Sequence, residues 1–530
     1  MIALSLADLV SATQGMLIVD DSLTELVIDN VVTDSRAFKN EEQRNSAFLA
    51  LKGAKFDGHR FVEQVIIDGC PLVIVDHEIQ SIDKSITAQL VVKDTRIALG
   101  HIAAYVKRTL APKTVGITGS SGKTTVKEMT AAILSRLGNV LATQGNFNND
   151  IGVPLTLLRL TAEHDFAVIE MGANHMGEIA YTSNLVKPDV AIINNIAAAH
   201  LEGFGDLCGV ARAKGEIFSG LGDSGVALYN QDTKYTAKWQ WRLTDKTVNT
   251  FSCDAKADKN ITDEGKPDCY SSNVTLDENG CASFILHTLL GDCAIRLNIP
   301  GQHNVCNAVA AASIALAFDA SLDDIRIGLA KMQEVKGRLN LHQLSEHFKL
   351  IDDSYNANVE STKAATQLLS GYSGKRILIL GDMGELGSEA RSYHQEVGQF
   401  AANLPVDVLL SLGVLSQSAS DAFRLNISSS TLSAVDKDKS QHFNERSLLI
   451  QHLIDIIQPI LDSDGATENK QELAILVKGS RSARMERVIE DIKQWYLNSK
   501  HKKQAEKLDK ASEKIDAVKI NPTANQLGAK

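Results

Sequence analysis

The sequence has little cysteine, no long apolar run and no surplus of positive charge. Seven Cys are scattered through 530 residues without any Cys-x-x-Cys pair. In a chain this long, an odd number of dispersed cysteines is typical of a reducing compartment, so we expect free and mostly buried thiols. No apolar run reaches the ~18 residues that a membrane-spanning helix needs. Residues 1–35 contain neither Lys nor Arg, which argues against a secretory signal, and we expect a cytoplasmic protein.

The charge balance excludes some classes of protein. The chain has 54 Lys and Arg against 65 Asp and Glu, a net charge of −11. A dedicated nucleic-acid binder needs surplus positive charge, so we expect no nucleic-acid partner. With 44% hydrophobic and 22% charged residues, the composition is that of a globular chain, neither collagen-like nor wholly disordered. The length suggests three or four domains.

Short apolar strands alternate with helical patterns along most of the chain, which predicts an α/β fold with parallel sheets. Helical periodicity is found over residues 99–110 and 304–332. Residues 245–300 carry a hairpin signal, Asn279-Gly280, and predict a small β extension. We expect strands at residues 72–75, 90–92, 114–118, 166–169, 190–193, 349–351, 376–380, 406–410 and 473–477.

These patterns divide the chain into domains at residues 1–98, 99–335 and 336–496, followed by a tail at 497–530. Residues 500–519 have seven Lys, four acidic residues and no aromatic residue. Such a segment is typical of a solvated helix or a disordered tail.

The strongest motif is a phosphate loop between a predicted strand and a predicted helix that starts near Val126. Glycines let backbone N–H groups close on phosphate oxygens, and the helix N-terminus adds positive potential. Lys123 would neutralise phosphate charge, and the Thr124 hydroxyl would reach Mg²⁺. The spacing departs from the usual pattern because Gly116 lies one residue early. The motif comprises Gly116, Ile117, Thr118, Gly119, Ser120, Ser121, Gly122, Lys123, Thr124 and Thr125.

Polar residues follow the next predicted strands, where ligands bind in a doubly wound sheet. Glu170 ends one strand and offers the oxygen ligand that a hard cation prefers. Asn194 and Asn195 end the next strand, and His200 follows as a candidate nitrogen ligand. Lys214 lies in a polar helical segment, and its neighbours alone indicate a surface lysine.

Three polar loops follow strands in the third block, at residues 352–358, 381–387 and 478–484. Flexible polar loops at the ends of several parallel strands are typical of a ligand site. Their Arg and Lys side chains suit a carboxylate or a phosphate, through charge-assisted hydrogen bonds.

The combined motifs resemble the Mur ligase family over residues 1–496. The loop from Gly116 to Thr125 is the family's variant of the ATP loop, with its offset glycine. Other segments that resemble the family are 146–155, 170–172, 195–202, 301–307 and 337–338. The segments 57–61, 353–358 and 478–486 resemble the members that add D-alanyl-D-alanine to a UDP-N-acetylmuramoyl-tripeptide, whose third residue is diaminopimelate or lysine. The polar loop from Phe38 to Ala47 and the Lys-rich tail depart from the family pattern.

This resemblance implies three domains: an N-terminal α/β domain for the UDP-sugar, a central phosphate-loop ATPase domain with the β extension, and a C-terminal Rossmann-like domain. It implies ligation through an acyl phosphate, with ATP and two Mg²⁺ ions, in a protein that we expect to be a monomer. The residues it implies are Ser35 and Arg36 for the UDP-sugar; Asn304, Asn307, Arg338 and Asp353 for ATP; Thr124, Glu170 and His200 for Mg²⁺; a carbamylated Lys214 for a second Mg²⁺; and Asn356, Asn358, Ser480 and Arg481 for the dipeptide.

Two other functions are compatible with a phosphate loop. A folylpolyglutamate-synthase-like ligase would use the same scaffold, but the ~98 residues before the loop argue against it because that relative begins near its loop. A nucleotide switch would hydrolyse ATP or GTP slowly without any amino acid. Glu170, His200 and the three polar loops favour ligation over switching.

Overall fold

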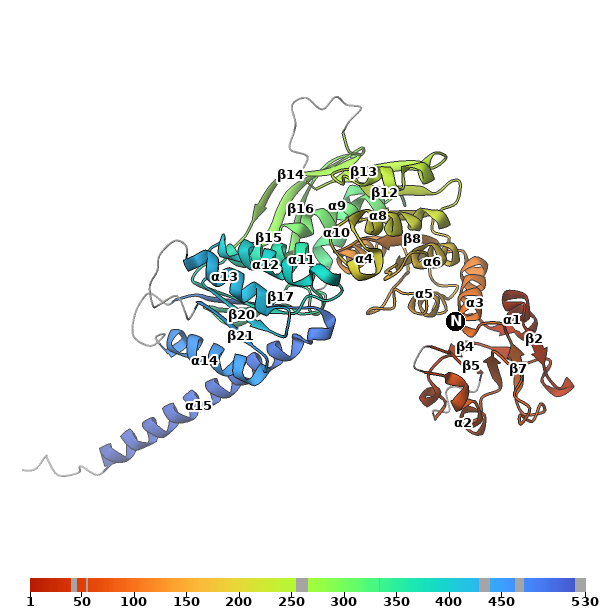
Figure 1. Cartoon of the computed structure of the whole chain (residues 1–530), viewed down its shortest axis with the longest axis horizontal. Coiled ribbons are helices and arrows are strands. Elements are labelled where there is room, and N and C mark those ends of the chain that lie inside the picture. Colours follow the sequence, from red (N-terminus) through yellow and green to blue (C-terminus); the bar gives the residue numbers. More distant parts are fainter. Residues whose placement is uncertain are drawn as a thin grey trace, which may run out of the picture. The chain divides into compact units, whose positions relative to one another are not determined.

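The computed structural model describes residues 1–39, 45–53, 56–253, 266–332, 334–428, 439–462 and 471–519. The chain divides into two compact units (Figure 1). The first contains Met1–Val335 with Glu385–Ser388, and the second contains Lys336–Gly384 with Glu389–Lys530. Each unit is described by itself below.

The first unit begins with a five-stranded sheet in the order β2-β7-β6-β5-β4. Its strands β4 to β7 are parallel, and β2 runs antiparallel to β7. Phe48 and Val73 pack on Val62 and Val65 of α2, so the sheet buries an apolar face. The elements are β1 (Leu4–Ser5), α1 (Leu6–Thr13), β2 (Met16–Ile18), β3 (Val27–Ile28), β4 (Asn30–Val32), β5 (Ser46–Leu49), α2 (Val62–Ile67), β6 (Leu72–Val75), β7 (Ala88–Val91) and α3 (Thr95–Leu110).

The polar loop noted between Phe38 and Ala47 is described only at its ends. Residues 40–44 lie outside the described residues. The ring of Phe38 is buried and meets the ring of Phe48 edge-on, with centroids 6.2 Å apart. Phe38 is therefore packed against Phe48 of the sheet.

A nine-stranded sheet follows, in the order β16-β15-β14-β13-β12-β11-β8-β10-β9. Strands β8 to β14 are parallel, whereas β15 and β16 complete it as antiparallel strands. The expected β extension is thus continuous with the main sheet. The strands are β8 (Lys113–Thr118), β9 (Val140–Ala142), β10 (Phe166–Glu170), β11 (Val190–Ile193), β12 (Val226–Asn230), β13 (Thr247–Ser252), β14 (Cys269–Leu276), β15 (Cys281–Thr288) and β16 (Gly291–Pro300).

Helices α4 and α9 cover one face of this sheet. Val126 and Met129 of α4 and Val309 of α9 are fully buried against sheet residues such as Val115 and Ile192. The helical periodicity found over 304–332 corresponds to two helices, because Ser321 caps a new helix with Asp324. The helices are α4 (Lys123–Leu134), α5 (Gly152–Leu157), α6 (Glu178–Val186), α7 (Leu201–Phe204), α8 (Leu207–Gly215), α9 (His303–Leu316) and α10 (Leu322–Lys331).

The second unit is built on a six-stranded sheet, in the order β17-β18-β22-β19-β20-β21. Its strands are parallel except β17. Helices α11 and α13 cover one face, and α14 and α15 cover the other (Figure 1). The elements are β17 (Asn340–Ser345), β18 (Phe348–Asp353), α11 (Val359–Ser370), β19 (Lys375–Gly381), α12 (Ala390–Ala402), β20 (Val408–Leu412), α13 (Gln417–Ser428), β21 (Ser440–Phe443), α14 (Arg446–Asp462), β22 (Leu473–Lys478) and α15 (Glu486–Lys519).

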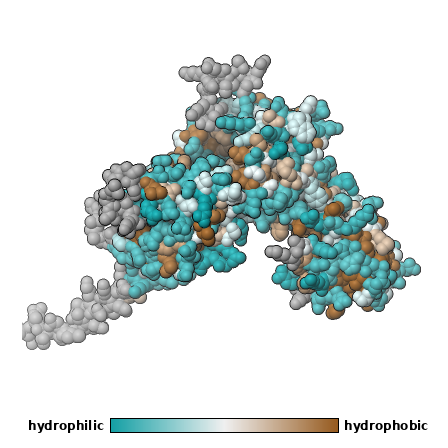
Figure 2. Space-filling model, viewed as in Figure 1, coloured by the Kyte–Doolittle hydropathy of each residue, from teal (hydrophilic) through white to brown (hydrophobic). Residues whose placement is uncertain are grey.

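The last helix, α15, carries the Lys-rich segment. Ile489 and Ile492 pack on the six-stranded sheet, whereas residues 501–505 are exposed. The predicted α/β fold with parallel sheets is therefore confirmed. Hydrophilic residues cover most of the face seen in Figure 2. Within the described part of the chain, no helix is both long enough and apolar enough to cross a bilayer.

One pair of cysteines is bonded, although free thiols were expected. Cys253, just after β13, and Cys306, in the first turn of α9, form a disulfide. The expectation of free thiols was wrong for this pair because the fold brings together residues 53 positions apart in the sequence. The free cysteines are Cys70, Cys208, Cys269, Cys281 and Cys293.

Candidate active site

The phosphate loop lies where the order of strands reverses in the central sheet. From β8 the chain first adds β9 and β10 on one side and then β11 on the other. Loops that leave the carboxyl ends of strands diverge at such a point and form a crevice. Register places Glu170 of β10 beside Ile117 and Ile193 of β11 beside Thr118. The residues after all three strands therefore lie together at one edge of the sheet.

Gly122 caps α4 and has a backbone that only glycine adopts easily, with a φ of 75°. A Cβ at this position would lie 2.3 Å from Oδ1 of Asn307 and 2.7 Å from Nδ2 of Asn194. Glycine thus serves two needs here, the left-handed turn and the close approach of two amides. Lys123 follows as the first residue of α4, and its Nζ donates to the carbonyl of Gly119 over 2.8 Å.

Two asparagines after β11 hold the phosphate loop. The Ser121 N–H donates to Oδ1 of Asn195 over 2.9 Å, and Nδ2 of Asn195 donates to the Ser121 carbonyl over 3.1 Å. Asn194 donates to the same carbonyl and to Oδ1 of Asn307. Ser120 exchanges hydrogen bonds with Ala197. The asparagines were expected at a strand end, but their support of this loop was not predicted.

The predicted metal ligands Thr124 and Glu170 are in contact. The Thr124 hydroxyl donates to Oε2 of Glu170 over 3.0 Å, and Nδ2 of Asn148 donates to Oε1 over 2.8 Å. Glu170 is only 2% exposed, so this carboxylate is fixed by neighbours rather than by water. Asn148 was missed as a site residue, although it lies in a segment that pointed to the family.

Lys214, near the end of α8, is buried and does not lie at the surface. It is 1% exposed, and among the described residues its Nζ has no hydrogen-bond partner. Phe204 lies beside it, with Nζ 5.8 Å from the ring centroid. Burial, and secondarily the charge of Lys123, lower the pKa of Lys214 well below its ordinary value. The reading of a surface lysine was wrong because packing across the fold, which local sequence does not reveal, encloses it.

His200 contacts the same aromatic ring, that of Phe204. Its imidazole meets Phe204 edge-on, with centroids 6.3 Å apart. His200 precedes α7 in a left-handed conformation, with a φ of 54°, which is uncommon outside glycine. Phe204 thus contacts both candidate ligands, His200 and Lys214.

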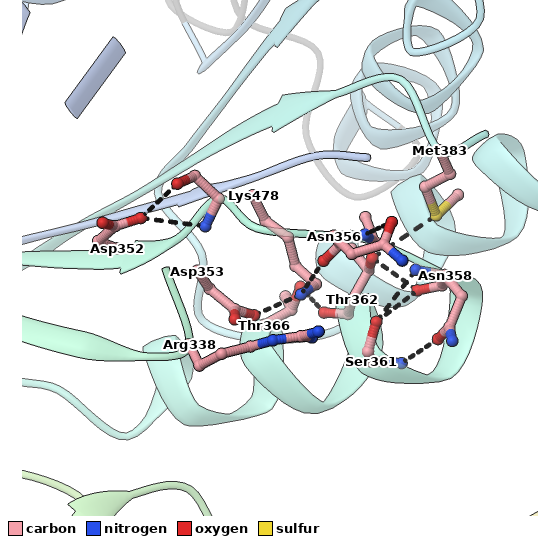
Figure 3. Close-up of polar contacts among 12 residues, drawn as sticks. Arg338, Asp352, Asp353, Asn356, Asn358, Ser361, Thr362, Thr366, Met383 and Lys478 are labelled. Carbon is pink, nitrogen blue, oxygen red and sulfur yellow. Dashed lines mark hydrogen bonds and ion pairs between the residues drawn. The ribbon is translucent and has the colours of Figure 1, made fainter. Parts of the chain in front are cut away.

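In the second unit, a buried ion pair joins two of the predicted polar loops (Figure 3). Nζ of Lys478, at the end of β22, contacts Oδ2 of Asp353, at the end of β18. It also donates to the carbonyl of Asn356 over 3.0 Å. Lys478 is 1% exposed, and burial lowers its pKa although Asp353 opposes this shift. Lys478 therefore fixes the loop that carries Asp353 and Asn356.

Two arginines flank the ring of Tyr355 in that loop. The guanidinium carbon of Arg338 is 4.5 Å from the ring centroid, and that of Arg481 is 5.7 Å from it. Nε of Arg338 is buried without a hydrogen-bond partner among the described residues. The side chain of Arg481 is 65% exposed. Two cations held on one aromatic ring favour an anionic ligand, such as a phosphate or a carboxylate.

The remaining predicted residues of this unit have structural contacts. Asn358 caps α11, where its Oδ1 accepts the Ser361 N–H over 2.8 Å. Oδ1 of Asn356 accepts the Ala357 N–H over 2.9 Å. Ser480 is 4% exposed, and its hydroxyl lies 3.0 Å from that of Ser482. Their roles toward a substrate remain predictions.

Ser35 and Arg36 begin a short turn after β4 in the N-terminal sheet. Arg36 holds Asp34 with both Nε and Nη2, the latter over 2.6 Å. This hydrogen bonding lowers the pKa of Asp34 to about 2. The Arg36 side chain is 83% exposed, so an anionic ligand can reach it.

Comparison with protein families gives two matches in this chain. Residues 117–315 match the Mur ligase middle domain, and residues 337–481 match the Mur ligase glutamate ligase domain. The first match covers the phosphate loop, Glu170, His200 and Lys214.

Individual relatives match nearly the whole chain. The UDP-N-acetylmuramoyl-tripeptide–D-alanyl-D-alanine ligase of Escherichia coli K12 is 43% identical over 92% of this chain and 98% of its own. A crystal structure of MurF from Acinetobacter baumannii has a TM-score of 0.81 at 38% identity, over 93% of this chain and 99% of that one. A MurF ligase from Thermotoga maritima in complex with ADP shares the fold, with a TM-score of 0.73 at 23% identity over 91% and 100% of the two chains.

One domain model matches the part of the first unit that carries the phosphate loop, the other matches most of the second unit, and the similarity to single relatives extends over the N-terminal sheet as well. The chain belongs to the Mur ligase family.

Proposed function

We propose that the protein is an ATP-dependent ligase that adds D-alanyl-D-alanine to UDP-N-acetylmuramoyl-tripeptide and so forms a pentapeptide precursor of peptidoglycan. The observation that carries the proposal is its similarity to a relative named for this reaction over 98% of that relative's length, at 43% identity. The similarity thus includes the parts that would select the substrates as well as the phosphate loop. We place the reaction in the cytoplasm because ATP drives it.

The chemistry requires activation of a carboxylate. A carboxylate is a poor acyl donor because its leaving group would be oxide. Transfer of the γ-phosphoryl group of ATP gives an acyl phosphate, from which phosphate departs easily. The free amine of D-alanyl-D-alanine then attacks the carbonyl carbon, and phosphate leaves from the tetrahedral intermediate. Lys123 would stabilise negative charge on the transferring phosphoryl group.

The donor set around Thr124 fits a hard divalent cation. A hydroxyl and a carboxylate oxygen meet over 3.0 Å at the end of the phosphate loop, and Mg²⁺ prefers such oxygen ligands. Thr124, Glu170 and His200 would hold this ion. When bound, Mg²⁺ neutralises phosphate charge and orients the phosphoryl group. Asn148 would keep the Glu170 carboxylate in place.

The environment of Lys214 fits carbamylation. A buried amine without a hydrogen-bond partner favours its neutral form, and a neutral amine adds to CO₂ with release of one proton. The product is an anionic oxygen ligand, which suits a second Mg²⁺ among the phosphates. Carbamylation would also satisfy a buried polar atom that is otherwise costly to leave unpaired.

The other predicted residues would bind the organic parts of the substrates. Asn304 and Asn307 would contact adenine, Asp353 the ribose and Arg338 an ATP phosphate. Arg481, with Asn356, Asn358 and Ser480, would bind the dipeptide or the acyl substrate. Ser35 and Arg36 would contact the UDP group.

The test is phosphate release by the purified protein with Mg²⁺-ATP, UDP-N-acetylmuramoyl-tripeptide and D-alanyl-D-alanine, each omitted in turn. We expect release only when all three are present. Release that does not need the tripeptide or the dipeptide would contradict ligation and favour a nucleotide switch. Release with folate and glutamate instead would retain the scaffold but change the substrate.

A further inference from the structure

The disulfide between Cys253 and Cys306 lies beside the first turn of α9. Cys306 is in that turn, between Asn304 and Asn307, and its Cα is 4.6 Å from that of Cys253. This separation is within the range that a disulfide spans. The other described cysteines of the first unit form no disulfide: Cys70 and Cys269 are buried, whereas Cys208, Cys281 and Cys293 are half-buried.

Cys253 is held in place by the strands around it. Its N–H donates to Oδ2 of Asp232 over 3.1 Å, and its carbonyl accepts the Ser271 hydroxyl over 2.6 Å. Nδ2 of Asn230, at the end of β12, lies 3.2 Å from Sγ of Cys253 and 3.8 Å from Sγ of Cys306. One sulfur is thus held by the sheet, and the other belongs to α9.

The first turn of α9 is in turn connected to the phosphate loop. Nδ2 of Asn307 donates to Oδ1 of Asn304 over 2.9 Å, and Oδ1 of Asn307 accepts from Nδ2 of Asn194 over 3.1 Å. The same Oδ1 is so near Gly122 that no Cβ would fit there. A displacement of Cys306 therefore reaches the loop that would bind phosphate, through a chain of adjacent amides.

We propose that Cys253 and Cys306 are a redox-responsive thiol pair, oxidised by low-molecular-weight disulfides, and that formation of their bond weakens ATP binding. The structure shows the bonded form of the pair, and a reducing compartment would convert it to two thiols. The thiolate of one cysteine attacks the small disulfide and releases one small thiol. The second cysteine then attacks the mixed disulfide and releases another. The two protein thiols lose two electrons and two protons, and the small disulfide gains them as two thiols.

The direction of the effect follows from the geometry. Two sulfurs that are not bonded keep a wider separation than a disulfide, whose S–S bond is ~2 Å long. Bond formation would therefore draw the first turn of α9, with Asn304 and Asn307, toward the end of β13. The placement of adenine at Asn304 and Asn307 rests on the proposed function, whereas the contact of Asn307 with Gly122 does not.

The experiment compares the reduced and oxidised full-length protein. One sample is reduced and desalted, and another is equilibrated with oxidised glutathione. Intact mass after alkylation is expected to show two fewer alkylated cysteines in the oxidised sample, without a retained glutathione. Calorimetric titration with Mg²⁺-ATP is expected to give a Kd at least ~5-fold higher for the oxidised form, the lower end of usual coupling between sites. By reciprocity, ATP would then hinder oxidation by the same factor.

Variants identify the residues responsible. Cys253→Ser should bind Mg²⁺-ATP with the Kd of the reduced wild type, whether or not it has been treated with oxidised glutathione. Cys306→Ser serves as a second variant if the first fails to fold. Cys293→Ser is the matched control and should respond as the wild type does. A pair that stays alkylatable after oxidation, or equal Kd values for the two wild-type forms, would overturn the proposal.

A separate variant distinguishes this inference from the placement of adenine. Asn304→Ala is titrated with Mg²⁺-ATP in the reduced state. If its Kd equals that of the wild type while oxidation still weakens binding, the adenine placement fails and the thiol pair stands. If Asn304→Ala weakens binding and oxidation does not, the thiol pair alone fails.

Discussion

The hydroxyl of Thr124 donates to the carboxylate of Glu170 over 3.0 Å, although 46 residues separate them in the sequence. This contact joins the phosphate loop to the neighbouring strand β10. The two residues lie at or after the ends of neighbouring parallel strands at the point where the strand order reverses, so the fold itself assembles the pair.

Glu170→Gln should lower kcat/KM by about 100-fold, because it removes the negative charge of a metal ligand without changing the shape of the side chain. The concentration of Mg²⁺ needed for half-maximal rate should rise as well. Glu163→Gln, at an exposed carboxylate of the same unit, is the control and should leave both quantities unchanged. An unaltered Mg²⁺ dependence in Glu170→Gln would remove this residue from the proposed metal site.

Lys214→Ala should be inactive and regain part of its rate when formate or acetate is added. A small carboxylate can occupy the space that the shortened side chain leaves and supply the oxygen ligands of the proposed carbamate. Lys214→Arg keeps a cation, fills the space and cannot form the carbamate, so added carboxylate should not rescue it. Full activity of Lys214→Ala without any carboxylate would contradict the carbamate.

The depressed pKa of Lys214 also predicts how stability depends on pH. The unfolded chain binds a proton at this lysine up to about its ordinary pKa of 10.5, whereas the folded chain releases it at lower pH. Lys214 therefore makes its full contribution to the free energy of unfolding above pH 10.5, its ordinary pKa. That contribution is lost as the pH falls toward the depressed pKa of the folded protein. Because of Lys214, the free energy of unfolding changes by at most about 1.4 kcal/mol per pH unit.

Lys214→Met should remove this slope and raise the free energy of unfolding near pH 8. The measurement is urea unfolding of both proteins between pH 7 and pH 9.5, in buffer free of CO₂ so that the amine is not modified. If the free energy of unfolding depends on pH in the same way for the wild type and for Lys214→Met, Lys214 titrates normally in the folded protein.

Lys478→Met should destabilise the second unit by about 3–5 kcal/mol, because removing one partner leaves Asp353 buried and unpaired. Arg424 pairs with Asp421 at the surface, where both side chains are about half exposed, so Arg424→Met should change stability by less than about 1 kcal/mol. Chemical unfolding of the two variants measures the difference. Equal effects would mean that the Lys478 pair contributes no more than a surface pair.

Arg481→Ala should raise the KM for D-alanyl-D-alanine by about 10-fold or more and change the Kd for ATP little, because a charge-assisted hydrogen bond to a carboxylate contributes ~1.5–3 kcal/mol. Arg487→Ala removes an exposed arginine of α15 and is the matched control. If Arg481→Ala instead weakens ATP binding and leaves the dipeptide KM unchanged, Arg481 belongs with Arg338 on the nucleotide side.

Buried strands were predicted well from the sequence because their signal is local. The strands at 72–75 and 190–193 were predicted with their observed bounds. Each is a continuous apolar run, as strands covered on both faces require. The break between α9 and α10 was missed, although Ser321 and Asp324 form a capping box whose spacing is visible in the sequence.

The residues that the sequence could not place depend on contacts between distant segments. Lys214 has polar and small neighbours in the chain, yet Gly215 next to it packs so closely on Trp239 that a Cβ would lie 2.7 Å from that side chain. The side chain of Asn148 reaches Glu170, and that of Asn195 reaches Ser121 of the phosphate loop. Both contacts join segments that are far apart in the sequence. No spacing rule marks such positions, because the sheet order that joins them is a property of the fold.

The measurement that tests ligation most directly follows isotope from the acyl substrate. UDP-N-acetylmuramoyl-tripeptide labelled with ¹⁸O in its terminal carboxylate is incubated with the protein, Mg²⁺-ATP and D-alanyl-D-alanine, and both products are analysed by mass spectrometry. An acyl phosphate predicts a pentapeptide product together with phosphate that carries one ¹⁸O from the carboxylate. Unlabelled phosphate, or phosphate without a pentapeptide, would contradict the account.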